Sequence, residues 1–218
     1  TADSRHSPES DIMGFIALID YGMGNLKSVY NALVKIGFNC RISGEIKDIE
    51  KSDKLILPGV GAFKDAMDNL EKMNLIPIIN KKVNEGCPLL GICLGMQMLF
   101  EEGYEGQPRK GLGFIEGEVK LIEPNEEVKI PHIGWNRLEI NKKSKIFNGL
   151  NEESFVYYVH SFMSTNMSED NLIAYSEYGG INIPGMVNKR NIYGAQFHPE
   201  KSGEVGLRIL KNFGELIV

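Results

Sequence analysis

A five-residue segment at positions 91–95, GICLG, constrains the fold of this chain more than any other segment. It directly follows the apolar run of residues 88–90 and begins a stretch with helical periodicity. A nucleophile in the pattern G-x-nucleophile-x-G is typical of a sharp strand-to-helix turn, where the glycines let the backbone turn and hold the central side chain clear of the sheet. The central residue is Cys93. The segment therefore predicts a strand, a tight elbow that carries a thiol, and a helix.

Short buried runs alternate with helical patterns through the first half of the chain. A helix is predicted after the first run, with Asn25 placed to cap its start and Gly37 to end it, and a second helix is predicted over residues 75–83. This order predicts an open parallel sheet with right-handed crossovers, whose ligands bind beyond the carboxyl ends of the strands. The apolar runs expected to form its strands are residues 15–19, 54–57 and 89–92.

The second half of the chain differs from the first because it is rich in β-forming residues. A strand over residues 192–197 returns to the core, and a final helix begins at Gly203 with Ser202 as its N-cap. The expected fold class is α/β, an open and mainly parallel sheet with flanking helices and an antiparallel β extension in the second half. The segments expected to form that extension are residues 117–123, 137–140, 155–162, 171–178 and 181–189.

Charge and cysteine content narrow the function. A net charge of -5 argues against a nucleic-acid or anionic-membrane surface, because no basic excess offsets phosphate repulsion. Three cysteines without C-x-x-C spacing suit a reducing compartment and no structural zinc, so a soluble, cytoplasmic protein is expected. Residues 1–12 are polar and aperiodic and lack a starting Met. We expect them to be added or disordered residues before a native start at Met13, with one domain over residues 13–218.

Cys93 needs help to act as a nucleophile, because a free cysteine with a pKa of about 8.5 is only a few per cent thiolate at neutral pH. The amino end of the following helix would lower that pKa by less than about one unit. A histidine that accepts the proton, with a carboxylate behind it to fix its tautomer, would supply the rest. His198 and Glu200 are two positions apart, so in an extended segment both side chains point to the same face.

Each of these residues also has a plainer interpretation. Cys93 could be a small buried hydrophobe, as free cysteines usually are. His198 and Glu200 could be a surface pair at the end of a strand. The flanking glycines and an independent glycine-rich loop favour the catalytic interpretation of all three residues.

That loop is residues 58–61, PGVG, immediately after the predicted strand at 54–57. A tetrahedral intermediate on an amide needs backbone N–H donors, and the turn at Gly59, Val60 and Gly61 can present one while the amide of Leu94 presents the other. An ordinary strand-end turn is the alternative. Residues 22–25 (GMGN) superficially suggest a dinucleotide loop, but they lack the third glycine of G-x-G-x-x-G.

These residues resemble the class I, triad-type glutamine amidotransferases. Residues 91–97 (GICLGMQ) look like the nucleophile motif of that family, and residues 198–200 (HPE) look like the rest of its triad. The resemblance runs from about residue 16 to residue 217. Further motifs are similar to those of the glutaminase subunits of imidazole glycerol phosphate synthases, namely residues 20–25 (DYGMGN), 58–63 (PGVGAF), 131–135 (PHIGW), 159–161 (VHS) and 198–202 (HPEKS).

The resemblance implies a flavodoxin-like domain that hydrolyses L-glutamine to glutamate and ammonia with Cys93 as nucleophile and no metal or cofactor. Gln97 lies one helical turn after Cys93 and could contact substrate, or it could be a helix-surface glutamine. By similarity to the family, Glu105 would bind the substrate ammonium, and Ser161 and its neighbours would line the same pocket through backbone contacts. Two departures are Phe162, where the family has tyrosine, and a short loop over residues 101–107.

The resemblance also implies a partner, because this chain has no second domain to accept ammonia. The partner would be a (β/α)8 cyclase subunit that makes imidazole glycerol phosphate and aminoimidazole carboxamide ribotide in histidine biosynthesis. Asn25, Trp135 and Lys201 are candidate interface residues, and rotation of a peptide beside Val60 could couple the two subunits. Two alternatives stay open at this point, a paralogue that feeds ammonia to a nucleotide or a surface sugar, and a non-catalytic module of the same fold.

Overall fold

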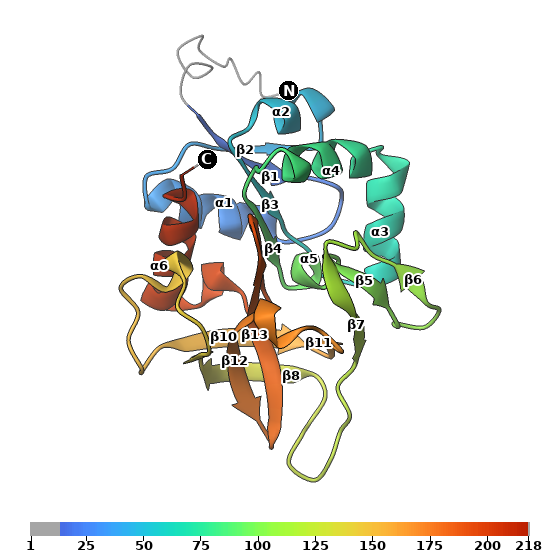
Figure 1. The fold of residues 1–218 in the computed structure, drawn as a ribbon, viewed down its shortest axis with the longest axis vertical. Coiled ribbons are helices and arrows are strands. Elements are labelled where there is room, and N and C mark those ends of the chain that lie inside the picture. Colours follow the sequence, from blue (N-terminus) through green and yellow to red (C-terminus); the bar gives the residue numbers. More distant parts are fainter. Residues whose placement is uncertain (1–13, 218) are drawn as a thin grey trace.

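A mainly parallel sheet of eight strands forms the centre of the protein, which we describe from a computed structural model over residues 14–217 (Figure 1). Its strand order is β2-β1-β3-β4-β14-β13-β12-β9. The first five strands in this order pair in parallel: β2 (Cys40–Ser43), β1 (Ile16–Ile19), β3 (Lys54–Leu57), β4 (Leu89–Ile92) and β14 (Ile192–Ala195). The last three pair antiparallel: β13 (Ile181–Lys189), β12 (Leu172–Tyr178) and β9 (Glu139–Ile140). The predicted α/β class is confirmed.

Helices cover both faces of this sheet because its central strands are apolar on both sides. In β1, Ile16 and Leu18 pack on the side of α1 (Leu26–Lys35) and α6 (Gly203–Gly214), whereas Ala17 and Ile19 pack on the opposite side. The helices of that opposite side are α2 (Ile46–Lys51), α3 (Phe63–Lys72), α4 (Ile76–Asn84) and the single turn α5 (Leu94–Gln97).

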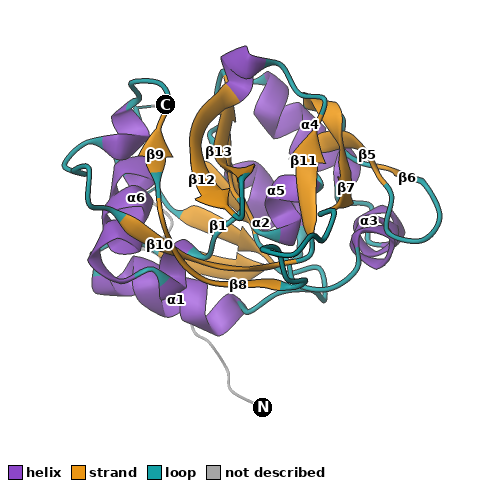
Figure 2. Ribbon diagram, turned by 90° about the horizontal axis from the view of Figure 1, so that it is seen from below, coloured by secondary structure: helices purple, strands orange, loops and turns teal. Residues whose placement is uncertain are grey.

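Two smaller sheets are added to the central one. A four-stranded sheet lies beside α3 and α5 (Figure 2), in the order β11 (Phe162–Thr165), β7 (Ile115–Leu121), β5 (Phe100–Gly103) and β6 (Arg109–Lys110). An antiparallel pair, β8 (His132–Arg137) with β10 (Phe155–His160), lies beyond the end of the sheet where β4 gives way to α5. Three short 3-10 turns complete the described part: η2 (Lys145–Phe147), η3 (Glu169–Asn171) and η4 (Pro199–Lys201).

Several sequence expectations need correction. The predicted strand at 155–162 is two strands that belong to different sheets, and 137–140 is divided between β8 and β9. The expected loop at 101–107 begins inside β5, which pairs with β6. The expectation for residues 1–12 lies outside the described residues.

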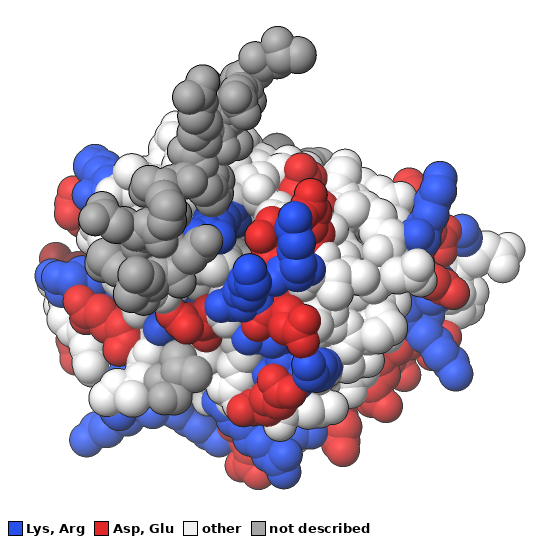
Figure 3. All heavy atoms as spheres, turned by 90° about the horizontal axis from the view of Figure 1, so that it is seen from above, with Lys and Arg blue, Asp and Glu red and all other residues white. Residues whose placement is uncertain are grey.

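The predicted helix ends are correct in position but only partly in mechanism. Gly37 has a φ of 95° and ends α1 in the predicted way, with its N–H donating to the carbonyl of Val34. Asn25 and Ser202 occupy the N-cap positions of α1 and α6, yet neither side chain makes a capping hydrogen bond. Among the helices of residues 14–217, none is long and apolar enough to cross a membrane. On the face shown in Figure 3, basic and acidic side chains are interspersed.

Candidate active site

The elbow after β4 places Cys93 in an unusual backbone conformation. Cys93 has φ 54° and ψ -112°, a region that side-chain-bearing residues rarely occupy and that costs of order 1–3 kcal/mol. The flanking glycines are required for close packing, because a Cβ on Gly95 would lie 1.9 Å from the carbonyl oxygen of Leu57 and one on Gly91 would lie 2.5 Å from that of Gly95. The positive φ of the elbow falls on the thiol residue itself, and neither flanking glycine has one.

His198 and Glu200 form a buried pair beside this elbow. The Nδ1–H of His198 donates to Glu200 Oε1 at 2.7 Å, and the two side chains are 5% and 1% exposed. The segment is not extended as expected, because residues 199–201 form η4. The hydroxyl of Ser202 holds this turn in place by donating to the carbonyl of His198 at 2.6 Å and accepting from the N–H of Tyr157 at 3.0 Å.

The proton affinity of His198 is set by three opposing effects. Burial lowers the pKa of His198, whereas its interactions with the Cys93 sulfur and the Glu200 carboxylate raise it, and the result is a pKa of about 10. Because Nδ1 is committed to Glu200, Nε2 is the nitrogen available to Cys93. The arrangement can therefore keep a proton on His198 while the sulfur carries the negative charge.

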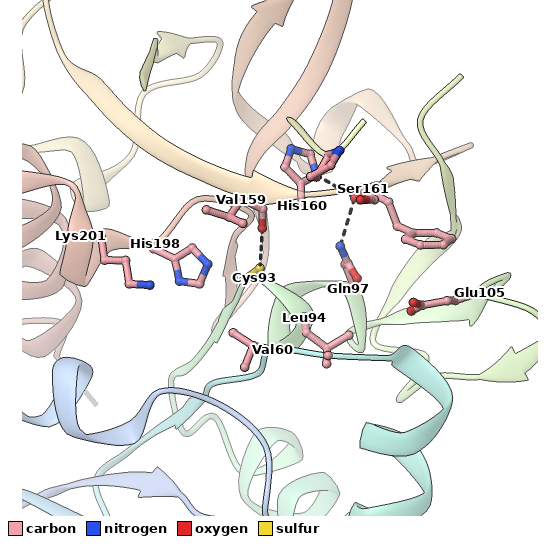
Figure 4. Close-up of a pocket in the computed structure, with 13 residues that line it drawn as sticks. Val60, Cys93, Leu94, Gln97, Glu105, Val159, His160, Ser161, His198 and Lys201 are labelled. Atoms are coloured by element: carbon pink, nitrogen blue, oxygen red, sulfur yellow. Dashed lines mark hydrogen bonds between the residues drawn. The ribbon is translucent and has the colours of Figure 1, made fainter. Parts of the chain in front are cut away.

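A cavity of about 320 Å³ opens over Cys93 (Figure 4), a volume at the lower end of the range for small-ligand pockets. It brings together most of the residues that the sequence singled out. Of the predicted residues, those that line it are Val60, Gly61, Cys93, Leu94, Gln97, Glu105, Ser161, His198 and Lys201. His160 and Phe162, the neighbours of Ser161, also line it as the resemblance implied, whereas the contributions of Pro131 and Val159 to its walls were not predicted. Within residues 14–217, no cluster of three or more His, Cys, Asp or Glu side chains could hold a metal ion.

The loop of residues 58–61 lies beside the elbow, but it faces the Leu94 amide with a carbonyl. The N–H of Leu94 donates to the carbonyl of Gly59 at 3.3 Å. A trans peptide directs its N–H opposite to its C=O, so the N–H of Val60 points away from Leu94. Of the two oxyanion donors expected from the sequence, one is engaged and the other is turned away in this conformation.

Gln97 and Glu105 are each held by backbone groups at the cavity wall. The Gln97 Nε2 donates to the Phe162 carbonyl at 3.1 Å and to Gln196 Oε1 at 3.2 Å, so it is a buried residue and not a helix-surface glutamine. Both amide hydrogens are used, which leaves Oε1 for any contact with a ligand. Glu105 Oε2 accepts from the N–H of Phe63 at 3.1 Å.

The three candidate interface residues are exposed, and one of them, Lys201, lines this cavity. Lys201 is exposed and lies beside His198 at the cavity rim. Trp135, on β8, is 55% exposed and packs against the ring of Tyr157 at 5.7 Å between centroids. Asn25 is exposed and follows Gly24, where a Cβ would lie 3.2 Å from the N of Gly59. Gly24 thus allows close approach of the 22–25 loop to the 58–61 loop.

The fold and the site define a class of protein, the α/β amidotransferases with a cysteine, a histidine and a glutamate at the carboxyl edge of the sheet. The family described as "Glutamine amidotransferase class-I" matches residues 17–216. Two solved structures share the fold. One is described as PurLQS from Thermotoga maritima (19% identity, 92% of this chain and 97% of that chain, TM-score 0.74). The other is a further glutamine amidotransferase from Thermotoga maritima (17% identity, 92% of this chain and 82% of that chain, TM-score 0.63).

Relatives with much higher identity define the family more narrowly. The chain is 52% identical to imidazole glycerol phosphate synthase subunit HisH of Lactococcus lactis, over 93% of this chain and 98% of that protein. It is 46% identical to the protein of the same name from Oceanobacillus iheyensis, over 93% of this chain and 99% of that protein. The chain belongs to the class I glutamine amidotransferases and, within them, to the family of imidazole glycerol phosphate synthase subunits HisH.

Proposed function

We propose that this chain hydrolyses L-glutamine to glutamate and ammonia at the cavity over Cys93, as one domain spanning residues 13–218. The observation that carries the proposal is the buried His198–Glu200 pair beside a thiol that a strained elbow holds at the cavity floor. The relatives' shared name supports the same activity class.

Each step of the proposed reaction is assigned to a named group. Cys93 Sγ attacks the carboxamide carbon, and the amides of Leu94 and, after the peptide between Gly59 and Val60 rotates, of the Gly59–Gly61 turn would stabilise the oxyanion. His198, held by Glu200, gives its proton to the departing ammonia and then takes one from the water that hydrolyses the glutamyl thioester. The released glutamate carries, on its new side-chain carboxylate, one oxygen that comes from this water molecule.

The proposed substrate contacts are those of the cavity wall opposite Cys93. Glu105 lies at the far side of the cavity and supplies a carboxylate for the substrate ammonium. Gln97 accepts through its free Oε1, and Ser161 contributes backbone contacts. Because Phe162 contacts Gln97 through its carbonyl, that contact does not need a side-chain hydroxyl at position 162.

The ammonia is delivered to a (β/α)8 cyclase subunit that makes imidazole glycerol phosphate and aminoimidazole carboxamide ribotide. The proposed docking face includes Lys201 at the rim of the cavity, together with the exposed Asn25 and the exposed Trp135 on β8. The names of the relatives favour this acceptor over the nucleotide or surface-sugar acceptors of a paralogue. A cytoplasmic location stays a prediction from the free thiols of Cys40 and Cys87.

Alkylation with a glutamine-mimicking diazoketone tests the proposal. The reagent should add once, at Cys93, and abolish glutamine hydrolysis, while excess glutamine should protect the thiol. Cys40 and Cys87 are buried away from the cavity and serve as internal controls in the same mass spectrum. Loss of activity without a Cys93 adduct, or an adduct that leaves activity intact, would contradict the assignment of Cys93 as the nucleophile.

A further inference from the structure

Gln196 is a buried amide that contacts the nucleophile. It lies between the end of β14 and His198, is 0% exposed, and its backbone N–H donates to the carbonyl of Gly185 at 2.9 Å. Its side-chain Nε2 lies 3.8 Å from Cys93 Sγ, within hydrogen-bond distance for sulfur. A fully buried side-chain amide needs hydrogen-bond partners, and the partners of the Gln196 amide are Cys93 Sγ and the side-chain amide of Gln97.

The orientation of this amide follows from a single backbone carbonyl. The carbonyl of Phe162 can only accept, so the Gln97 atom 3.1 Å from it must be the amide nitrogen. The same nitrogen lies 3.2 Å from the Gln196 amide, which must therefore face it with its oxygen. The nitrogen of Gln196 is left facing the sulfur. Turning the Gln196 amide over would place two N–H donor groups against each other and a carbonyl oxygen against the thiolate.

Besides His198, the sulfur has two uncharged neighbours that respond oppositely to its charge. The thiol of Cys93 donates to the carbonyl of Val159 at 3.7 Å, a contact that favours the protonated form. The N–H of Gln196 favours the thiolate, because hydrogen bonds to charged acceptors are stronger than those between neutral groups. On loss of its proton, the sulfur is repelled by Val159 O and attracted by Gln196 Nε2.

We propose that Gln196 is a further catalytic residue, whose amide N–H stabilises the Cys93 thiolate and whose orientation is fixed through Gln97 by the Phe162 carbonyl. The proposal rests on the proposed function of Cys93 as the nucleophile. In this proposal Gln97 also positions the Gln196 amide, because loss of Gln97 would free that amide to rotate.

The test compares Gln196→Met, which keeps the length of the side chain and removes the donor, with the unaltered chain. The rate of Cys93 carboxamidomethylation by iodoacetamide is measured from pH 4 to 10 by mass spectrometry. We expect Gln196→Met to shift this profile toward higher pH, so that alkylation on its rising limb slows about tenfold, which corresponds to about one pH unit. The kcat for glutamine should fall in parallel while KM changes little.

A matched control separates this effect from the general loss of a buried amide. Asn212, in α6, donates to the carbonyls of Ile146 and Asn148 far from the cavity, so Asn212→Leu should lower stability without moving the alkylation profile. A Gln196→Met chain with the unaltered alkylation profile would overturn the proposal. Failure of the proposed function would look different, because Cys93→Ala would then still hydrolyse glutamine.

A measurement on the unaltered chain keeps the proposal testable if Gln196→Met does not fold. The side-chain amide of Gln196 is followed by NMR in protein labelled with 15N-glutamine. Its resonance should titrate together with the thiol of Cys93 and should become flat in Cys93→Ala. A resonance that ignores the thiol titration would contradict the contact.

Discussion

The contact between the Leu94 amide and the Gly59 carbonyl predicts that the isolated chain is a slow glutaminase. At 3.3 Å, this contact places a carbonyl where a developing oxyanion would need a donor, and it directs the N–H of Val60 away. Loss of one oxyanion donor costs roughly 2.7–4 kcal/mol in the barrier, which is about 100- to 1000-fold in kcat. We expect a gain of this size when the acceptor nucleotide and the cyclase subunit bind, because the peptide before Val60 can then rotate.

The assay is glutamate release at saturating glutamine, with and without the nucleotide and the cyclase subunit. The gain should be in kcat and not in KM, because an oxyanion donor acts mainly in the transition state. Alkylation of Cys93 by iodoacetamide is the control, since it forms no oxyanion and should change much less. Full glutaminase activity of the isolated chain, or activation through KM alone, would refute this reasoning.

Three further outcomes follow from the geometry. Gly95→Ala should fail to give a soluble folded protein in circular dichroism and solubility assays, because its Cβ would lie 1.9 Å from the Leu57 carbonyl oxygen; wild-type stability would contradict the packing. Cys93→Ala should lower the pKa of His198 from about 10 in an NMR titration. In the parent, the raised pKa stabilises the folded state below about pH 6.5, and this stabilisation is lost as pH rises through 10, so the variant should show a smaller loss over that range. An unchanged His198 titration would count against the sulfur contact. Trp135→Ala should weaken binding of the cyclase subunit by about 2 kcal/mol in calorimetry, as a buried interface aromatic does, while basal glutaminase activity stays unchanged; unaltered binding would place the docking face elsewhere.

The parallel core was predictable because its strands are short apolar runs between polar residues. The runs at 54–57 and 89–92 coincide with β3 and β4 of this core, and among the antiparallel strands the segment 181–189 coincides with β13. The edge strand β2 was missed, because only one side of it packs on a neighbouring strand and its residues are mixed in polarity. The helices α2 and α3 were also missed, although α3 carries a clear apolar stripe of buried residues.

At the site, the sequence supplied residue identities but could not supply conformations. Cys93, His198 and Glu200 were predicted from their motifs, and the structure brings them together. The positive φ of Cys93 and the orientation of the Gly59 carbonyl depend on packing between separate segments, which no local pattern encodes. Gln196 was missed because it lies in an apolar run, yet a lone amide in such a run is a signal that could have been followed.

In the proposed reaction, Cys93 produces ammonia that a partner consumes. The most direct measurement is synthesis of imidazole glycerol phosphate by the cyclase subunit in complex with the Cys93→Ala chain, supplied either with glutamine or with ammonium salts. We expect glutamine-dependent synthesis to be abolished and ammonia-dependent synthesis to match that of the unaltered complex. Glutamine-dependent synthesis that survives Cys93→Ala would contradict this claim.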